Sequence, residues 1–261
     1  MLRFCNLGSG SSGNATLVES CCGGDTVRVL VDCGLTLREL TRRLALRGCA
    51  PGQLNAVFVT HEHSDHVGCA TALMRKHAVP VWMSEGTWRG FAREHLPPAL
   101  LNFARDGEAI VIGAQLELKP YAVPHDAREP LQLTIGDGRH RLGVLTDAGI
   151  ETGRIVEELQ SCTALLLECN HDVQMLQAGP YPAFLKRRIA GARGHLSNDS
   201  AAGILARCNH AGLKHVVAAH LSEQNNRPEI AAQALAQVLH INAQEVIVAD
   251  PSNGSPWLDL H

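Results

Sequence analysis

One short loop, rich in metal-binding side chains, limits the possible folds of this chain more than any other feature. Residues 60–66 read Thr-His-Glu-His-Ser-Asp-His, between an apolar run typical of a strand and a helical run. Four side chains of this loop are of the types that bind zinc and similar ions: His61, His63, Asp65 and His66. Four donors exceed what one open catalytic ion takes from a single loop, so the loop indicates two adjacent ions. The zinc-protease motif HExxH is excluded, because Asp65 stands where its second histidine would be.

Three further donors each follow an apolar stretch that is typical of a strand. His125 follows residues 121–124, Asp147 follows residues 142–146, and His220 follows residues 216–219. A single histidine at the end of a strand is common. Three such donors in a chain that also carries the HxHxDH loop indicate a shared metal site.

Hydrophobic periodicity predicts hairpins first and then strands that alternate with helices. The expected strands are 2–7, 15–20, 27–32, 56–60, 79–83, several within 108–146, and then 164–169, 216–219 and 246–249. The expected helices are 36–47, 66–77, 85–95, 153–159, 181–192, 198–210 and 228–239. This order fits an α/β (α+β) protein in which helices enclose two sheets, with residues 1–261 forming one domain.

Composition narrows the class of protein. No run approaches the ~18 apolar residues that cross a bilayer, and no secretory signal is visible, so we expect no membrane partner. Nine cysteines, an odd number without a CxxC pair, are typical of reduced thiols in a cytoplasmic protein. The formal charge of −3 argues against a chain that coats nucleic acid non-specifically.

A glycine-rich loop at residues 8–13 matches the pattern GxGxxG of dinucleotide-binding folds. That fold requires a crossover helix of roughly 10 residues, whereas only residues 14–20 intervene, and they alternate as a strand would. A phosphate-binding Walker A loop is excluded, because Asn14 replaces its lysine. A hairpin whose amides and hydroxyls face the metals fits the loop, and a plain tight turn fits it equally. The substrate-binding candidates here are Ser9, Ser11, Ser12 and Asn14.

The HxHxDH loop and the order of the later donors resemble the metallo-β-lactamase superfamily. This resemblance implies a four-layer αββα sandwich with the site at one edge of its two sheets. It also implies two ligand sets, His61, His63 and His125 for the first ion and Asp65, His66 and His220 for the second, with Asp147 bridging them. Asp32 matches an aspartate that orients the metal loop in that family, although it also fits a simple turn.

Two segments between Asp147 and His220 add candidates for catalysis. The interval is too short for the domain that β-CASP nucleases of this superfamily insert there. His171 and His195 fit imidazoles that stabilise a phosphate and its leaving oxygen, and they also fit histidines of a helix cap or the core. Neighbouring polar candidates for substrate binding are Asn170, Ser197 and Asn198. The basic residues Lys186, Arg187, Arg188 and Arg193 fit a track for a phosphate backbone, although a solvated helix face explains them more simply.

Several longer strings resemble the YycJ/WalJ-like branch of this superfamily. They are residues 7–14 (LGSGSSGN), 60–66, 168–172 (ECNHD), 179–182 (GPYP), 194–198 (GHLSN) and 219–226 (AHLSEQNN). The branch implies a cytoplasmic metal-dependent phosphodiesterase, with 5'-to-3' exodeoxyribonuclease activity and a link to mismatch repair in some relatives. The weak basicity of this chain departs from expectation for a protein that binds long duplexes, and favours short or single-stranded ends.

The sequence thus predicts a hydrolase that cleaves a phosphodiester, with DNA ends as the partner, by a hydroxide held between two divalent ions. Ligand type does not distinguish Zn, Mn and Fe, and the sequence does not address oligomeric state. The catalytic candidates are Asp65, His171 and His195. Three alternatives stay open at this point: an acyl or thioester hydrolase of the lactamase or glyoxalase-II type, an RNA-directed phosphodiesterase, and a metal-binding protein without enzymatic activity.

Overall fold

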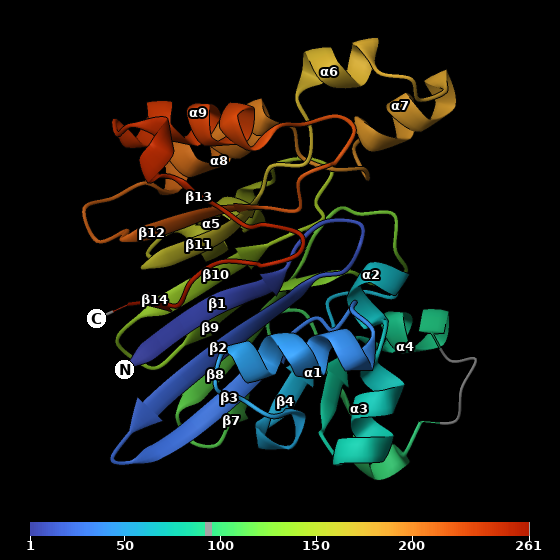
Figure 1. Ribbon diagram of the computed structural model, residues 1–261, viewed down its shortest axis with the longest axis vertical. Helices are drawn as coiled ribbons and strands as arrows, with labels where there is room; N and C mark the ends of the chain where they lie inside the picture. The colour runs from blue at the N-terminus through green and yellow to red at the C-terminus, as the bar shows by residue number, and fades with distance from the viewer. Residues whose placement is uncertain (92–95, 261) are drawn as a thin grey trace.

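Two packed sheets form the centre of the molecule, shown in Figure 1 as a computed structural model that describes residues 1–91 and 96–260. Within those residues each sheet has seven strands. The first sheet contains, in spatial order, β14 (Leu258–Asp259), β1 (Leu2–Gly8), β2 (Ala15–Cys22), β3 (Asp25–Val31), β4 (Ala56–Phe58), β5 (Val81–Met83) and β6 (Leu101–Phe103). The second contains β13 (Ile247–Val248), β12 (His215–Ala219), β11 (Ala164–Glu168), β10 (Arg141–Leu145), β9 (Leu131–Gly136), β8 (Leu116–Ala122) and β7 (Ile110–Ile112).

Each sheet is half antiparallel and half parallel. Hairpins join β1 to β2 and β2 to β3, and β3, β4, β5 and β6 then run parallel. The second sheet repeats this plan, with β7 to β10 antiparallel and β10, β11, β12 and β13 parallel. Because the carboxyl ends of parallel strands meet at one edge, each sheet gathers the loops that follow its strands.

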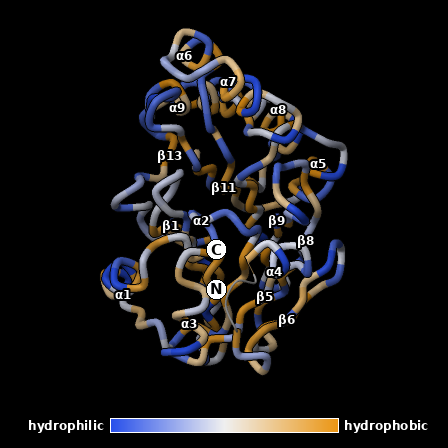
Figure 2. The backbone as a smooth tube through the Cα atoms, turned by 90° about the vertical axis from the view of Figure 1, so that its right-hand side faces the viewer, coloured by the Kyte–Doolittle hydropathy of each residue, from blue (hydrophilic) through white to orange (hydrophobic). Residues whose placement is uncertain are grey.

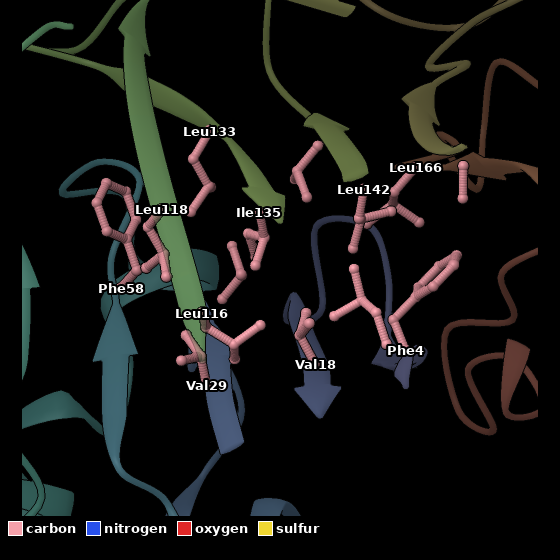
Figure 3. Close-up of a cluster of buried hydrophobic side chains, with 14 of the residues drawn as sticks. Phe4, Val18, Val29, Phe58, Leu116, Leu118, Leu133, Ile135, Leu142 and Leu166 are labelled. Carbon is pink, nitrogen blue, oxygen red and sulfur yellow. The ribbon is translucent and has the colours of Figure 1, made fainter. Parts of the chain in front are cut away.

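Apolar side chains from both sheets meet between them (Figure 3). Phe4, Val29 and Phe58 of the first sheet and Leu133 and Leu166 of the second are at most 1% exposed. Along β8, buried and less buried residues alternate, which is the period-two pattern of a strand with one face in a core. The burial of this apolar surface is the main force that holds the two sheets together.

Helices cover the outer face of each sheet, which confirms the predicted αββα sandwich. Buried residues of α1 (Leu37–Leu46) and α3 (Ala70–His77) share a cluster with β2, β3 and β4. The second sheet is covered by α5 (Gly153–Leu159), α8 (Asn198–Cys208) and α9 (Pro228–Leu239). Shorter elements are α2 (Ser64–Val67), α4 (Glu85–Phe91), α6 (Val173–Ala178), α7 (Ala183–Ile189), and the 3-10 turns η1 (Pro51–Gln53), η2 (Pro98–Leu100) and η3 (Ala243–Glu245).

The metal loop explains why the helix expected over residues 66–77 is divided in two. Helix α2 ends at Val67, and Gly68 separates it from α3. The backbone of Gly34 lies so close to this loop that a Cβ atom there would stand 1.7 Å from the carbonyl oxygen of Asp65. Gly34 and Gly68 therefore allow the metal loop to pack closely against the segment that follows β3. The helix expected over 85–95 is present as α4 up to Phe91, and residues 92–95 lie outside the described residues.

Two further observations concern the class of protein. In the described part of the chain, no helix combines the length and apolar character needed to span a membrane. All nine cysteines are unpaired, and seven of them lie in the core or close to it, Cys5 and Cys169 among them. Burial raises the pKa of the Cys5 thiol to about 12, so this group stays protonated at neutral pH.

Candidate metal centre

The expected metal-binding side chains all follow strands at one edge of the two sheets. His61, His63, Asp65 and His66 occupy the loop after β4 and the start of α2. His125, Asp147 and His220 follow β8, β10 and β12, and Asp32 follows β3. The contiguous loop of the first sheet therefore meets single donors from three strands of the second.

The structure brings these donors into two adjoining groups. One nitrogen each from His61, His63 and His125 lie within 4.8 Å of one another. Ligand atoms of Asp65, His66 and His220 form a second group at the same spacing. Asp147 joins the two groups. Its carboxylate lies close to the ligand atoms of His61 and His66, and it is also 2.9 Å from Nδ1 of His220. The structure thus brings together the residues that the family resemblance assigns to the two ligand sets and to the position between them.

The orientation of the donors fits metal ions better than it fits a hydrogen-bond network. Oδ2 of Asp147 and Nδ1 of His220 are 2.9 Å apart, yet neither atom has an aligned hydrogen-bond partner, although both are buried. Buried polar atoms are normally paired, so two unpaired atoms that converge indicate a missing common partner. Imidazole nitrogens and carboxylate oxygens accept Zn, Mn and Fe alike. The residues present thus fit a pair of divalent ions.

Electrostatics in the site follow from burial and close charges. Burial lowers the pKa of His61 well below its usual range, and so does the nearby charge on His66, which leaves His61 neutral with a free lone pair. For His66 burial acts in the same direction, but Asp147 and Asp32 outweigh it and raise the pKa well above its usual range. Burial would raise the pKa of Asp147, but His220 and His66 hold it well below its usual range. Positive charge is therefore stabilised where the donors converge.

Asp32 contacts two residues of the loop that carries the candidate ligands. Its Oδ2 lies 2.8 Å from Nδ1 of His66, and its Oδ1 accepts a hydrogen bond of 2.8 Å from the backbone N–H of Thr60. With Nδ1 held in this way, Nε2 of His66 faces Asp147 at 3.1 Å. A carboxylate that orients a metal-binding imidazole is a common support of metal sites. The family resemblance implied this role for Asp32, with a simple turn as the alternative, and the side chain of Thr60 was not singled out.

Three of these residues have a left-handed backbone. The φ angles are 60° at Asp32, 70° at Asp147 and 55° at His220. Each residue stands at or just past the end of a strand, where the reversal of the backbone turns the side chain into the site. Left-handed conformations of non-glycine residues cost on the order of 1–3 kcal/mol, and Asp, Asn and His tolerate them better than most.

Two residues of the glycine-rich loop form hydrogen bonds with candidate metal ligands. Oγ of Ser9 accepts a hydrogen bond of 2.7 Å from the backbone N–H of His220. Asn14 is buried, and its Nδ2 lies 3.2 Å from the carbonyl oxygen of Asp65 and 3.1 Å from Nε2 of His66. The remaining candidates of this loop, Ser11 and Ser12, are exposed.

His195 lies beside the metal ligands and is held by a buried carboxylate. Its Nδ1 is 2.7 Å from Oε1 of Glu168 and 3.4 Å from Oδ1 of Asp147. Glu168 is fully buried, and its Oε2 accepts the backbone N–H of Ala148 at 2.8 Å. Burial would lower the pKa of His195, but Glu168 outweighs it and raises the value to about 9. Sequence reasoning missed Glu168, although a charged residue at the end of the apolar strand β11 was an available signal.

The other polar candidates lie behind the site. Nδ2 of Asn170 donates to the backbone carbonyl of His220 at 3.1 Å, and Oγ of Ser197 caps α8. Asn198 is buried and exchanges two hydrogen bonds of 2.9 Å with Asn226, which sequence reasoning did not single out. His171 is buried, its Nδ1 has no hydrogen-bond partner, and burial lowers its pKa. Among the described residues His171 belongs to none of the donor groups.

A four-layer sandwich with a shared His and Asp donor set at its edge defines a class of metal-dependent hydrolases, the metallo-beta-lactamase superfamily. Residues 8–167 match the family model of this superfamily, so the chain belongs to it. The family and the donor set together support divalent metal cofactors and hydrolase activity.

Particular relatives narrow the position of the chain within that superfamily. It is 35% identical over 241 residues to "Exodeoxyribonuclease YycJ" of Bacillus anthracis, which covers 91% of this chain and 89% of that protein. It is 30% identical over 241 residues to "Exodeoxyribonuclease WalJ" of Streptococcus pneumoniae serotype 2 (strain D39 / NCTC 7466), with 91% and 88% covered. The crystal structure of the metallo-beta-lactamase fold protein YhfI from Bacillus subtilis superposes with a TM-score of 0.72 at 18% identity, with 99% and 100% covered. The predicted fold and the predicted YycJ/WalJ-like relationship are thus confirmed.

Proposed function

We propose that this chain is a metal-dependent exodeoxyribonuclease that shortens DNA from its 5' end. Two observations support the proposal. Relatives at 35% and 30% identity over 91% of the chain are named exodeoxyribonucleases. The donor set suits two ions, which is the number that in-line displacement at phosphorus uses in many nucleases.

Each group of donors has a distinct task in this proposal. His61, His63 and His125 would hold one ion, and Asp65, His66 and His220 would hold the other. Asp147 would be shared between the two groups. Two bound divalent ions activate water and offset the negative charge that develops on the phosphoryl oxygens. Asp65 is also partly exposed, which places a carboxylate at the open side of the site, where a substrate enters.

His195 is the observation that carries the phosphodiesterase proposal. Its Nδ1 is held by Glu168 and its side chain is 23% exposed, so its Nε2 remains available to a substrate beside the buried Asp147. An alkoxide leaving from a DNA phosphodiester needs a proton, and a fixed imidazole beside the reacting phosphate supplies it. His171 is more buried and, among the described residues, belongs to none of the donor groups. We therefore propose that His195, and not His171, protonates the leaving oxygen.

The domain organisation and the location of the enzyme are also part of the proposal. We propose that residues 1–261 work as one hydrolase unit on nucleic acid ends in the cytoplasm. Support for that location comes from nine unpaired thiols, which are typical of reducing compartments.

The first experiment measures metal content and cleavage with one preparation of protein. The substrates are bis-p-nitrophenyl phosphate, 5'- and 3'-labelled DNA in single- and double-stranded form, RNA of the same sequence, and a thioester. Stepwise release of nucleotides from the 5' end of DNA is the expected result. Metal-loaded protein that hydrolyses the thioester and no phosphodiester would contradict the proposal, and faster cleavage of RNA would redirect it to an RNA-directed enzyme.

A pair of histidine variants completes that experiment. His195→Ala removes the imidazole beside Asp147, and His77→Ala removes a partly exposed imidazole from the last turn of α3. Cleavage of DNA falls by at least about 100-fold in the first variant, because general acid catalysis contributes about that much. The second variant keeps the wild-type rate.

A further inference from the structure

Helices α6 and α7 form an arm, residues 173–193, whose charge differs from that of the whole chain. Between Asp172 and Asp199 the sequence contains four basic residues and no acidic residue, whereas the chain as a whole carries −3. Figures 1 and 2 show α6 and α7 at the same end of the molecule as α8 and α9, and Figure 1 shows them to one side of that pair. The arm is therefore a local positive region on a mildly acidic protein.

The arm also exposes an aromatic side chain. No residue of α7 is buried, and Phe184 is 66% exposed. The other exposed phenylalanine, Phe103, is 45% exposed and packs edge-on against Trp88. Phe184 and Arg187 are three residues apart on a helix, so their side chains lie on one face. This face combines a π-surface with a cation.

The basic side chains of the arm have two different uses. Arg188 is engaged by Asp126 at 2.6 Å, and Nζ of Lys186 donates to the carbonyl oxygen of Gln177 at 2.6 Å. These contacts hold α7 in place. Arg187 and Arg193 are exposed, and within the described residues neither guanidinium has a hydrogen bond or ion pair. Two cations therefore remain available for an external anion.

Short contacts connect the arm to the metal centre. Oδ1 of Asp126, whose other oxygen contacts Arg188, lies 3.3 Å from Nε2 of His125. The backbone N–H of His195 donates to the carbonyl oxygen of Ile189, the last residue of α7, at 2.8 Å. Asp126 and the backbone of His195 thus connect the arm to the metal centre.

We propose that this arm holds the single-stranded end of the nucleic acid, with Phe184 stacked on an unpaired base and Arg187 and Arg193 at neighbouring phosphates. The inference rests on the proposed function and adds a position for the strand. Single-strand binding sites combine aromatic stacking with a positive track for the backbone, which are the two features of this arm. The base must be unpaired, because bases in a duplex already stack on their neighbours. A protein partner fits less well, because α7 offers one large exposed apolar side chain among cations.

The test is binding of single-stranded oligodeoxythymidine of about 12 nucleotides, a length in the range of single-strand sites. Phosphorothioate linkages and a 5' fluorophore allow metal-loaded enzyme to be titrated by anisotropy. Phe184→Ala weakens binding by about tenfold, the scale of one stacked base, and Phe184→Trp keeps it. Leu46→Ala is the matched control, because Leu46 is also 66% exposed, on α1, and its loss leaves binding unchanged.

The cations are tested by the salt dependence of the same titration. Arg187→Ala reduces the slope of log Kd against log salt by about 0.7, the value for one phosphate on a single strand. Arg38→Ala removes the same exposed group from α1 and leaves the slope unchanged. Cleavage of DNA relative to bis-p-nitrophenyl phosphate falls by about tenfold in Phe184→Ala when DNA is limiting.

The possible outcomes separate this inference from the proposed function. Wild-type enzyme that cuts DNA, together with arm variants that bind like wild type, overturns the arm and leaves the nuclease. Wild-type enzyme that neither binds nor cuts DNA overturns both. If Phe184→Ala weakens binding of single-stranded DNA and of blunt duplex DNA equally, the proposal that Phe184 stacks on an unpaired base is overturned. A change of subunit assembly in light scattering, without a change in binding, assigns the arm to an interface between protein chains and also overturns the inference.

Discussion

The metal centre and the α6–α7 arm, which are in contact, carry charge under opposite physical conditions. In the centre, His66 and Asp147 are at most 1% exposed, and each contacts an oppositely charged group. In the arm, Arg187 is exposed and unpaired within the described residues. Interactions between buried charges are strong and depend on position, whereas exposed charges are screened by water and salt. Changes in the centre should therefore remove chemistry, and changes in the arm should alter affinity and its salt dependence.

The largest effect is expected at Asp147. Asp147→Asn keeps the left-handed backbone but removes the charge between the two donor groups, so hydrolysis of bis-p-nitrophenyl phosphate should fall by at least about 10³-fold. Bound metal, measured by mass spectrometry, should fall below that of wild type. Asp199→Asn, at an exposed position in the first turn of α8, serves as the control. A variant that keeps both its metal content and its rate would show that Asp147 is no ligand.

Glu168→Gln should have the next largest effect. The variant keeps the shape of the buried side chain but removes the charge that holds Nδ1 of His195, and kcat on DNA should fall by about 10- to 100-fold. The loss on bis-p-nitrophenyl phosphate should be smaller, because p-nitrophenolate leaves without a proton. Glu157→Gln, an exposed change on α5, is the control. Equal losses on both substrates would rule out His195 as the proton donor.

Asp32→Asn tests the support of the loop without removing a ligand. Asn tolerates the φ of 60° but does not carry the charge that faces His66, so metal affinity should weaken by about 10- to 100-fold. Competition with a chelating dye measures this change, and Asp25→Asn at the exposed start of β3 is the matched variant. Unchanged affinity would mean that Asp32 only shapes the turn.

The smallest effect is expected at a partly exposed cluster of charges on α1, which belongs to neither region. Hydrogen bonds from Arg42 and Arg43 lower the pKa of Glu39 from 4.5 to about 2. Because the folded value is depressed, this stabilisation is present above pH ~4.5 and is lost as pH falls through ~2. Glu39→Gln should therefore cost about 0.5 kcal/mol in urea unfolding at pH 7, with a difference that shrinks below pH ~4.5. A difference that stays constant down to acidic pH would assign it to packing.

The same comparison explains what could be predicted from the sequence. Four donors lie together in residues 61–66, so their chemistry is visible without a fold. His125, Asp147 and His220 were recognised because each follows a strand, and the parallel order of those strands brings them together. The helices that cover the sheets could be predicted because their apolar residues recur with helical periodicity. Helix α6 was missed because it buries only Leu176 and so has no apolar periodicity.

The pairing of side chains that are distant in the sequence could not be predicted, even where one partner, such as Glu168, gave a signal of its own. Glu168 and His195 are 27 positions apart, and their hydrogen bond depends on how the loop before α8 returns over β11. The pairing of Asn198 with Asn226 is of the same kind, because a polar residue in a loop gives no sign of which distant amide it will meet. Residue type predicts which side chains can bind metal, and topology decides which side chains support them.

The left-handed backbone at Asp32, Asp147 and His220 also constrains how the sequence can drift. A descendant that lost its metals would no longer need a carboxylate or an imidazole at these three positions. It would still need residues that adopt a positive φ wherever the strand ends keep the same turns. Asparagine and glycine are then the accessible replacements. A non-catalytic member of this lineage would therefore keep the left-handed backbone at these three positions after its ligand side chains had been replaced.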